Sequence, residues 1–231
     1  MMPETLAIAN EAIYHGHLDA TEKRPFSVFL PRGYEPRYAY PLLVMLHGRG
    51  EHESQWLAAL PELSRRNYIA LALRGPETVL ARRGRIGFGW RNAEVDDYVL
   101  AAIDEVRSRW NVHSRRTLAV GVDEGAALAL RLGLQLPMTF GGAVSLNGWL
   151  PEGPLGLTSA AQRLRGVSGP SFFIGHSASH ASVPPARSES AASLLYTAGF
   201  DVEGKLYSTS ATLCRAMLRD LDHWLVGLCT R

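Results

Sequence analysis

The sequence is poor in cysteine, and the two that it has are Cys214 and Cys229. They are too few for a disulfide framework and do not have the spacing of metal ligands. We therefore expect a reducing compartment, the cytoplasm. We also expect neither a metal nor another cofactor. The amino terminus has no basic segment followed by an apolar core, and no apolar run is long enough to span a bilayer. These absences predict neither a signal peptide nor a membrane span.

An excess of charge of one sign is also missing. The 24 basic and 22 acidic residues give a formal net charge of +2, which gives no reason to expect nucleic-acid binding. The densest basic segments, 82–85 and 107–116, are more typical of solvated faces. Hydrophobic residues make up 46% of the 231 residues, enough for a substantial core. No repeat or long linker divides the chain, so we expect a single domain over residues 1–231.

Apolar strand-like runs alternate along the chain with segments of helical period. Strands are predicted at 26–30, 40–46, 68–73, 117–120, 142–146, 171–174 and 202–207. Helices are predicted at 54–66, after Asn92 up to 110, after Gly125, and at 185–198 and 213–228. This alternation is typical of an α/β protein with a mostly parallel sheet and helices on both faces. In such sheets ligands bind beyond the carboxyl ends of the strands.

One of these strand-to-helix connections reads Gly121-Val122-Asp123-Glu124-Gly125. An apolar strand, a tight turn between two glycines and a helix form the setting of a nucleophile elbow, written G-x-S-x-G. The central position here holds Asp123 instead of serine. Either the carboxylate serves as the nucleophile, or the ordinary chemistry of the elbow is lost.

Four stretches carry a resemblance to a known family: "PLLVMLHGRGEHESQW", "AVGVDEGAALALRLG", "GGAVSLNGWLP" and "VPPARSESAASLLYTAGFDVEGKLY". From about residue 26 onward, the chain resembles α/β-hydrolases of the phospholipase/carboxylesterase family, which includes acyl-protein thioesterases. The resemblance implies an α/β-hydrolase fold and a site for an ester-like substrate or another small molecule. It also leaves open whether the chain forms a homodimer.

The resemblance places the family's catalytic triad on three residues of a different type. The serine nucleophile falls on Asp123, and the acidic member, three residues before Val183, falls on His180. The catalytic histidine falls on Ala211, or on Thr212 after a slip of one position. The backbone N–H groups of the oxyanion hole would come from Arg49 and Glu124.

These replacements predict the loss of serine esterase activity. A serine hydrolase needs a hydroxyl, a base to deprotonate it and a group to orient the base. Asp123 offers no hydroxyl, and Ala211 offers no base. A carboxylate at Asp123 would also oppose the negative charge that develops in the oxyanion hole. We expect a pseudo-hydrolase with a vestigial or ligand-binding pocket, in which Asp123 forms a hydrogen-bonded ion pair with His180 or, as second choice, with Arg49.

The alternative is an active hydrolase in which Asp123 is the nucleophile, as in epoxide hydrolases and haloalkane dehalogenases. The dipole at the start of the following helix would keep the carboxylate ionised, and His180 would be the base. Epoxides, halides or activated esters are then the expected substrates. A metal site from Asp123, Glu124 and His180 is disfavoured, because consecutive residues of an elbow point apart.

Overall fold

The computed structural model describes residues 5–8, 11–18, 24–63, 66–81, 84–152 and 169–230. The strands are β1 (Thr5–Ile8), β2 (Glu11–Leu18), β3 (Arg24–Phe29), β4 (Tyr40–Leu46), β5 (Ile69–Leu73), β6 (Glu77–Leu80), β7 (Ile86–Gly89), β8 (Val112–Val122), β9 (Gly142–Leu146), β10 (Ser171–Ser177) and β11 (Val202–Tyr207). The helices are α1 (Ser54–Ala59), the 3-10 turn η1 (Leu60–Glu62), α2 (Val95–Arg109), α3 (Glu124–Gln135), α5 (Pro185–Thr197) and α6 (Arg215–Cys229). No described helix is long and apolar enough to cross a membrane.

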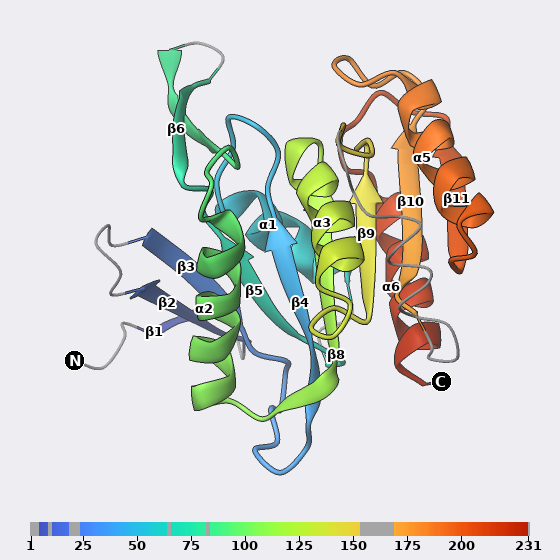
Figure 1. Ribbon diagram of the computed structural model, residues 1–231. Helices are drawn as coiled ribbons and strands as arrows, with labels where there is room; N and C mark the ends of the chain where they lie inside the picture. Colours follow the sequence, from blue (N-terminus) through green and yellow to red (C-terminus); the bar gives the residue numbers. More distant parts are fainter. Residues whose placement is uncertain are drawn as a thin grey trace.

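A nine-stranded sheet forms the centre of the molecule, in the order β1-β2-β3-β5-β4-β8-β9-β10-β11 (Figure 1). Six neighbouring strands run parallel: β5, β4, β8, β9, β10 and β11. At the other end of the sheet, β1, β2 and β3 pair antiparallel, and β3 is also antiparallel to β5. Helices α2, α3 and α5 cover one face, and α1 and α6 cover the other. The predicted α/β class, with a mostly parallel sheet between two layers of helices, is confirmed.

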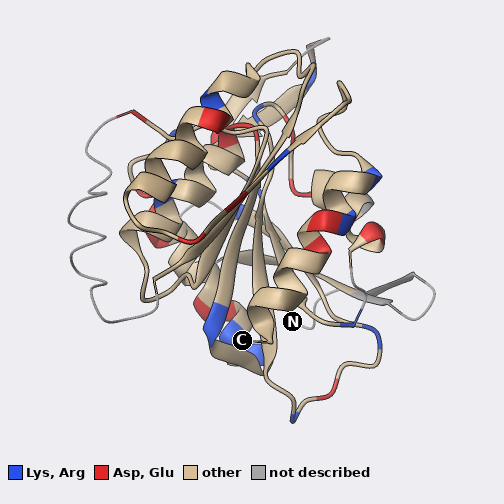
Figure 2. Ribbon diagram, turned by 90° about the vertical axis from the view of Figure 1, so that its right-hand side faces the viewer, with Lys and Arg blue, Asp and Glu red and all other residues tan. Residues whose placement is uncertain are grey.

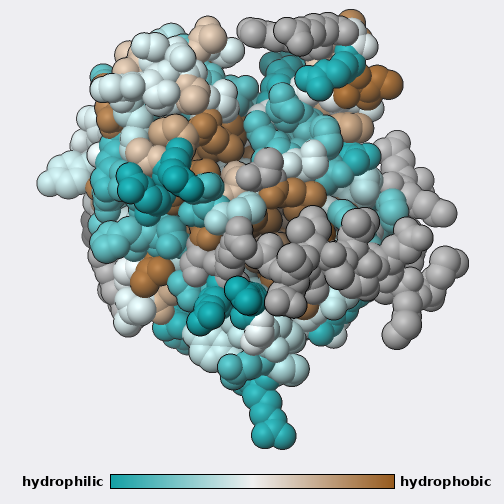
Figure 3. Space-filling view, turned by 180° about the vertical axis from the view of Figure 1, so that it is seen from behind, coloured by the Kyte–Doolittle hydropathy of each residue, from teal (hydrophilic) through white to brown (hydrophobic). Residues whose placement is uncertain are grey.

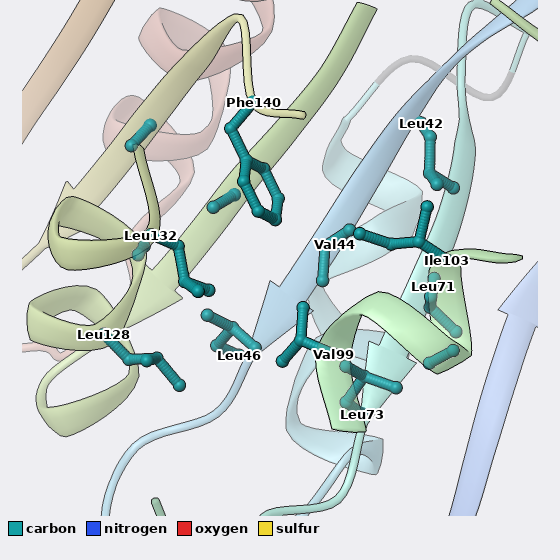
Figure 4. Packing of buried hydrophobic residues seen from close by; sticks show 14 of the residues in the cluster. Leu42, Val44, Leu46, Leu71, Leu73, Val99, Ile103, Leu128, Leu132 and Phe140 are labelled. Atoms are coloured by element: carbon teal, nitrogen blue, oxygen red, sulfur yellow. The ribbon is translucent and has the colours of Figure 1, made fainter. Parts of the chain in front are cut away.

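Strand β4 shows why the sheet is buried on both faces. Its side chains alternate between two clusters: Leu42, Val44 and Leu46 pack toward α2 and α3, while Leu43 and Met45 face α1 and α6. A strand that is covered by apolar side chains on both faces has an uninterrupted hydrophobic sequence, and β4 has such a sequence. Figure 4 shows the first cluster, where side chains of β4 and β5 meet Val99 and Ile103 of α2 and side chains of α3.

The predicted strands 40–46, 142–146 and 202–207 have the bounds that the sequence indicates. The helix predicted at 54–66 is split, because Pro61 has no N–H to continue the α-helical ladder and lies within the 3-10 turn η1, which begins at Leu60. The helix predicted directly after Asn92 begins at Val95. The Asn92 side chain instead accepts a 2.7 Å hydrogen bond from the N–H of Glu94 within the preceding turn.

Two antiparallel hairpins escape the sequence pattern. One is formed by β1 and β2, at the edge of the main sheet. The other is formed by β6 and β7 and projects from the end of the molecule at which the parallel strands finish (Figure 1). The backbone of Phe88 in β7 bonds to Gly50 and Glu51, so this second hairpin is fixed to the loop that follows β4.

Candidate active site

The turn around Asp123 has the strained backbone of an elbow. Asp123 has φ 52° and ψ −117°, in a region that residues with a side chain rarely adopt. A Cβ atom at Gly121 would lie 2.1 Å from the carbonyl oxygen of Gly125, and one at Gly125 would lie 2.4 Å from that of Leu46. The two glycines are therefore required by the close approach of β8, α3 and β4. This explains sterically why the elbow pattern persists around a residue other than serine.

The carboxyl group of Asp123 is half-buried and faces the turn that follows β4. A Cβ atom at Gly48 would be 3.8 Å from its Oδ2. Burial raises the pKa of Asp123 above its ordinary value, and Glu124 adds to the rise. His180 and the backbone N–H groups of Arg49 and Glu124 act in the opposite direction on this pKa. Desolvation outweighs these opposing groups, so the pKa of Asp123 is raised although its carboxyl group lies at the start of α3.

The resemblance assigns the N–H groups of Arg49 and Glu124 to the oxyanion hole. In the structure, both lie close enough to the Asp123 carboxyl group to lower its pKa. The carboxyl oxygens of Asp123 thus lie beside the donors that would otherwise face the oxyanion of a reacting ester.

The side chain of Arg49 does not pair with Asp123, so the second expected partner is wrong. Its guanidinium donates to both carboxylate oxygens of Glu77, at 3.0 and 3.1 Å, and to Glu124 at 2.9 Å. Glu124 also accepts a 3.2 Å hydrogen bond from the N–H of Trp90. Its carboxylate is therefore held on the side of Trp90, whereas that of Asp123 faces Gly48. These contacts tie the elbow to the hairpin β6–β7.

His180 is placed near Asp123 but makes its hydrogen bonds elsewhere. Its Nδ1 accepts a hydrogen bond of 3.2 Å from the N–H of Val183, and its Nε2 lies 3.5 Å from Oγ1 of Thr212. No hydrogen bond joins the described side chains of Asp123 and His180, and only an electrostatic effect on the pKa of Asp123 connects them. The expected hydrogen-bonded ion pair is therefore wrong, because the backbone of Val183 occupies Nδ1.

Ala211 lies exposed in the loop between β11 and α6. Its carbonyl oxygen accepts a 2.6 Å hydrogen bond from Oγ of Ser177, and the next carbonyl, that of Thr212, accepts one of 2.6 Å from the Asn147 side chain. Sequence reasoning missed Asn147 and Ser177 as supports of this loop. Asn147 has φ 55° directly after a buried strand, and asparagine is among the few residues that tolerate this conformation.

His47 supports the turn that carries Arg49. Its ring is buried, with Nδ1 2.7 Å from the carbonyl oxygen of Gly48, while Nε2 accepts a 2.9 Å hydrogen bond from the N–H of Gly75. Burial is the largest cause that lowers the pKa of His47, to about 4. The ring is therefore neutral at physiological pH and holds the loops after β4 and β5 together.

An open cleft of about 750 Å³ connects these residues. It is lined by the hairpin residues 78–81 and Arg85 on one side and by Ser182, Ser210 and Thr212 on the other, and both Asp123 and His180 reach it. In Figure 3 a notch at the top of the molecule separates the hairpin from the loops after β10 and β11. The site is thus accessible to a small molecule rather than sealed.

Among the described residues, no three His, Cys, Asp or Glu side chains gather in a way that could hold a metal ion. The contacts of Glu124 show that its carboxylate is turned toward Arg49 and Trp90, away from the Asp123 carboxyl group. The described residues of the site therefore provide hydrogen bonds and charge, but no metal-binding cluster.

Comparison with known proteins gives one family model and several relatives of similar sequence or fold. The family model described as Phospholipase/Carboxylesterase matches residues 92–228, more than half of the chain. A curated relative, "Putative esterase NocK" of Nocardia uniformis subsp. tsuyamanensis, is 29% identical over 126 residues, which cover 49% of this chain. The match spans only about a third, 34%, of the length of that relative.

Solved structures of similar shape include acyl-protein thioesterase 2 of Zea mays and a carboxylesterase of Bacillus cereus. The first is 21% identical with a TM-score of 0.68, over 88% of this chain and 98% of its own. The second is 21% identical with a TM-score of 0.63, over 91% and 96%. At such identities the likeness concerns the fold, and the expected α/β-hydrolase fold is confirmed.

Proposed function

The chain belongs to the phospholipase/carboxylesterase family, and we propose that it is a pseudo-hydrolase whose cleft binds a small ester-like molecule without hydrolysing it. The cleft is open and large enough for a small ligand. The backbone N–H groups of Arg49 and Glu124 act on the carboxyl group of Asp123. Binding is therefore the activity that the geometry supports best.

The observation that carries this proposal is the hydrogen bond from the N–H of Val183 to Nδ1 of His180. A backbone N–H can only donate, so Nδ1 supplies the lone pair and the proton of the neutral ring is on Nε2. The nitrogen beside Thr212 is then a donor. A general base needs a free lone pair toward the water that it activates. His180 does not offer one in this arrangement.

The position of the Asp123 carboxyl group supports the same conclusion. Oxyanion stabilisation requires N–H donors that are free to face the developing charge. The N–H groups of Arg49 and Glu124 act on the carboxyl group of Asp123, and a bound ester would have to displace it. An ester carbonyl in the cleft would thus meet a carboxyl oxygen where an active esterase presents donors.

The proposal is tested by measuring hydrolysis of p-nitrophenyl acetate, butyrate and octanoate. We compare the natural chain with Asp123→Ser and with a triple variant that adds His180→Asp and Ala211→His. Ala211 is exposed, so the larger histidine has room. We expect background rates for the natural chain and for the single variant, and a measurable gain only for the triple variant. Robust turnover by the natural chain that Asp123→Asn abolishes would contradict the proposal.

Binding is measured separately, with butyramide as a probe that resists hydrolysis, by titration calorimetry. Ser210 lines the cleft, so Ser210→Trp should fill part of it and weaken binding at least roughly tenfold. Ser193→Trp, at an exposed position of α5 outside the cleft, is the matched control and should bind like the natural chain. Equal affinity in both variants, or no saturable binding by the natural chain, would remove the ligand-binding part of the proposal.

One observation favours the carboxylate nucleophile as a second candidate: the strained elbow is kept, and its side chain reaches an open cleft near His180. Attack by an Asp123 oxygen on a haloalkane carbon would form an ester and release halide. Because His180 offers no free base, this ester should persist. Incubation with 1-bromobutane followed by intact-mass measurement tests this step. A butyl adduct that Asp123→Asn prevents would support the candidate, and an unmodified mass would contradict it.

A further inference from the structure

Strand β11 ends the main sheet with one open edge. Within the part of the chain that the structure describes, it pairs only with β10. The carbonyl oxygens of Asp201 and Tyr207 accept hydrogen bonds from Phe172 and Ala178 on that side, each of 2.8 Å. Because backbone groups alternate along a strand, those of residues 202, 204 and 206 point outward. Figure 2 looks onto this edge and shows β11 crossing the front of the molecule.

Two large hydrophobic side chains are exposed at this edge. Leu206 is 58% exposed, and Tyr196 of the neighbouring helix α5 is 72% exposed. Gly204 lies at the centre of the strand and has no side chain. A Cβ atom placed there would have the Cβ of Ala192 as its nearest neighbour, at 4.0 Å. The centre of the edge is therefore free of bulk that would keep another strand away.

Glu203 and Lys205 flank Gly204 on the other face of the strand. Their side chains are 45% and 37% exposed, and they form a 3.1 Å ion pair with each other. Lys205 also lies 3.5 Å from Asp220 of α6. A lysine on an edge strand often discourages pairing with other strands. Here Glu203, two positions away, offers a carboxylate that the lysine of a second copy can pair with.

We propose that two copies of this chain pair through their β11 edges, antiparallel, about a two-fold axis at Gly204, so that their sheets become continuous. In this register Gly204 lies opposite its own copy, with their outward backbone groups exchanging hydrogen bonds. Val202 lies opposite Leu206 of the other copy, which covers an exposed leucine. The proposal is independent of whether the cleft is catalytic.

Charge favours this register, because both charged pairs formed within the strand are of opposite sign and no like charges lie opposite each other. With the axis at Glu203, the two glutamates would lie directly opposite each other, and with the axis at Lys205 the two lysines would do so. With the axis at Gly204, each Glu203 lies opposite a Lys205, twice in the dimer. Opposite charges across an antiparallel pair stabilise it, while like charges destabilise it. The order acid–glycine–base is therefore self-complementary about its centre.

The test is sedimentation-velocity centrifugation of the purified full chain over a range of concentrations. We expect a dimer, and we expect Gly204→Pro to give a folded monomer, because proline removes the outward N–H without breaking a bond to β10. Circular dichroism checks that the variant is folded. A natural chain that stays monomeric at 100 µM, or a Gly204→Pro variant that is folded and still dimeric, would overturn the proposal.

Charge variants test the register without a change in backbone. Glu203→Lys places lysines opposite each other in both pairs, and Lys205→Glu places glutamates opposite each other. Each variant alone should raise the dimer dissociation constant roughly tenfold or more. A mixture of the two should form the heterodimer, in which every pair is again of opposite charge.

The matched control is Asp104→Lys, which makes the same change in net charge as Glu203→Lys, at an exposed position of α2. It should dimerise like the natural chain. Homodimers of the two edge variants that are as tight as the natural dimer, or a mixture that shows no preference for the heterodimer, would rule out an axis at Gly204.

Discussion

The N–H of Val183 donates a hydrogen bond of 3.2 Å to Nδ1 of His180 and thereby fixes which ring nitrogen carries the proton. His47 has the opposite arrangement, because its Nε2 accepts from the N–H of Gly75 and its Nδ1 lies 2.7 Å from a carbonyl oxygen. Two histidines at the same end of the sheet are thus held in different tautomers by backbone groups alone.

This contrast predicts a nuclear magnetic resonance result. Long-range ¹H–¹⁵N spectra at pH 8 should show the proton of His180 on Nε2 and that of His47 on Nδ1. His180→Gln and His47→Gln variants assign the signals. A proton on Nδ1 of His180 would mean that the bond from Val183 is absent, and the main reason for an inactive site would be lost.

Burial of Asp123 predicts that neutralising this residue stabilises the protein. The folded state has a raised pKa, so it binds the proton more tightly than the unfolded chain does. Stability is therefore reduced above the folded pKa and recovers as the pH falls toward the ordinary value of 3.8. Asp123→Asn should unfold at higher urea concentration than the natural chain at pH 7.5, and the difference should shrink as the pH falls. A variant that is less stable at pH 7.5 would contradict this.

The general plan of the fold was accessible from sequence because burial leaves a pattern. Strand β4 is buried on both faces and reads as an unbroken apolar run, so its bounds at Tyr40 and Leu46 were predicted. Strands β6 and β7 lie partly exposed in a projecting hairpin, and Leu80 and Ile86 are exposed rather than packed. Their apolar residues do not mark a core, so periodicity gave no signal there.

The candidate site was predictable in its positions and not in its contacts. Asp123 could be placed because Gly121 and Gly125 are required sterically wherever strand and helix meet so closely. The partner of its carboxyl group could not, because that choice depends on where the backbone N–H groups of Arg49 and Val183 point. Side-chain chemistry alone favoured an ion pair with His180, but the competing donors belong to the main chain.

Replacement of an elbow glycine should destabilise the fold strongly. A Cβ at Gly121 would lie 2.1 Å from a carbonyl oxygen of the backbone, which cannot move aside as a flexible side chain can. We expect Gly121→Ala to lower the free energy of unfolding by about 3 kcal/mol or more. Gly227→Ala in α6 is the control, since a Cβ atom at Gly227 would have no heavy atom within 4 Å apart from its own helix backbone and chain neighbours. It should raise stability by about 0.5–1 kcal/mol in urea unfolding. Similar losses in both variants would contradict the steric explanation.

Burial of His47 predicts a loss of stability in mild acid. Its folded pKa is lowered to about 4 from 6.5, so the unfolded chain binds the proton more readily between these values. Stability should be fully present above pH 6.5 and fall as the pH drops toward 4, by at most roughly 3 kcal/mol from this residue. His176 and His113 also have lowered pKa values, mainly through burial, and act in the same direction.

Comparison with His47→Gln isolates the contribution of His47. The variant should be less stable at pH 7.5, because it loses the bonds to Gly48 and Gly75, but its stability should depend less steeply on pH from 6.5 to 4.5. Parallel pH profiles for the two chains in urea unfolding would show that His47 is not the neutral buried group that holds these loops.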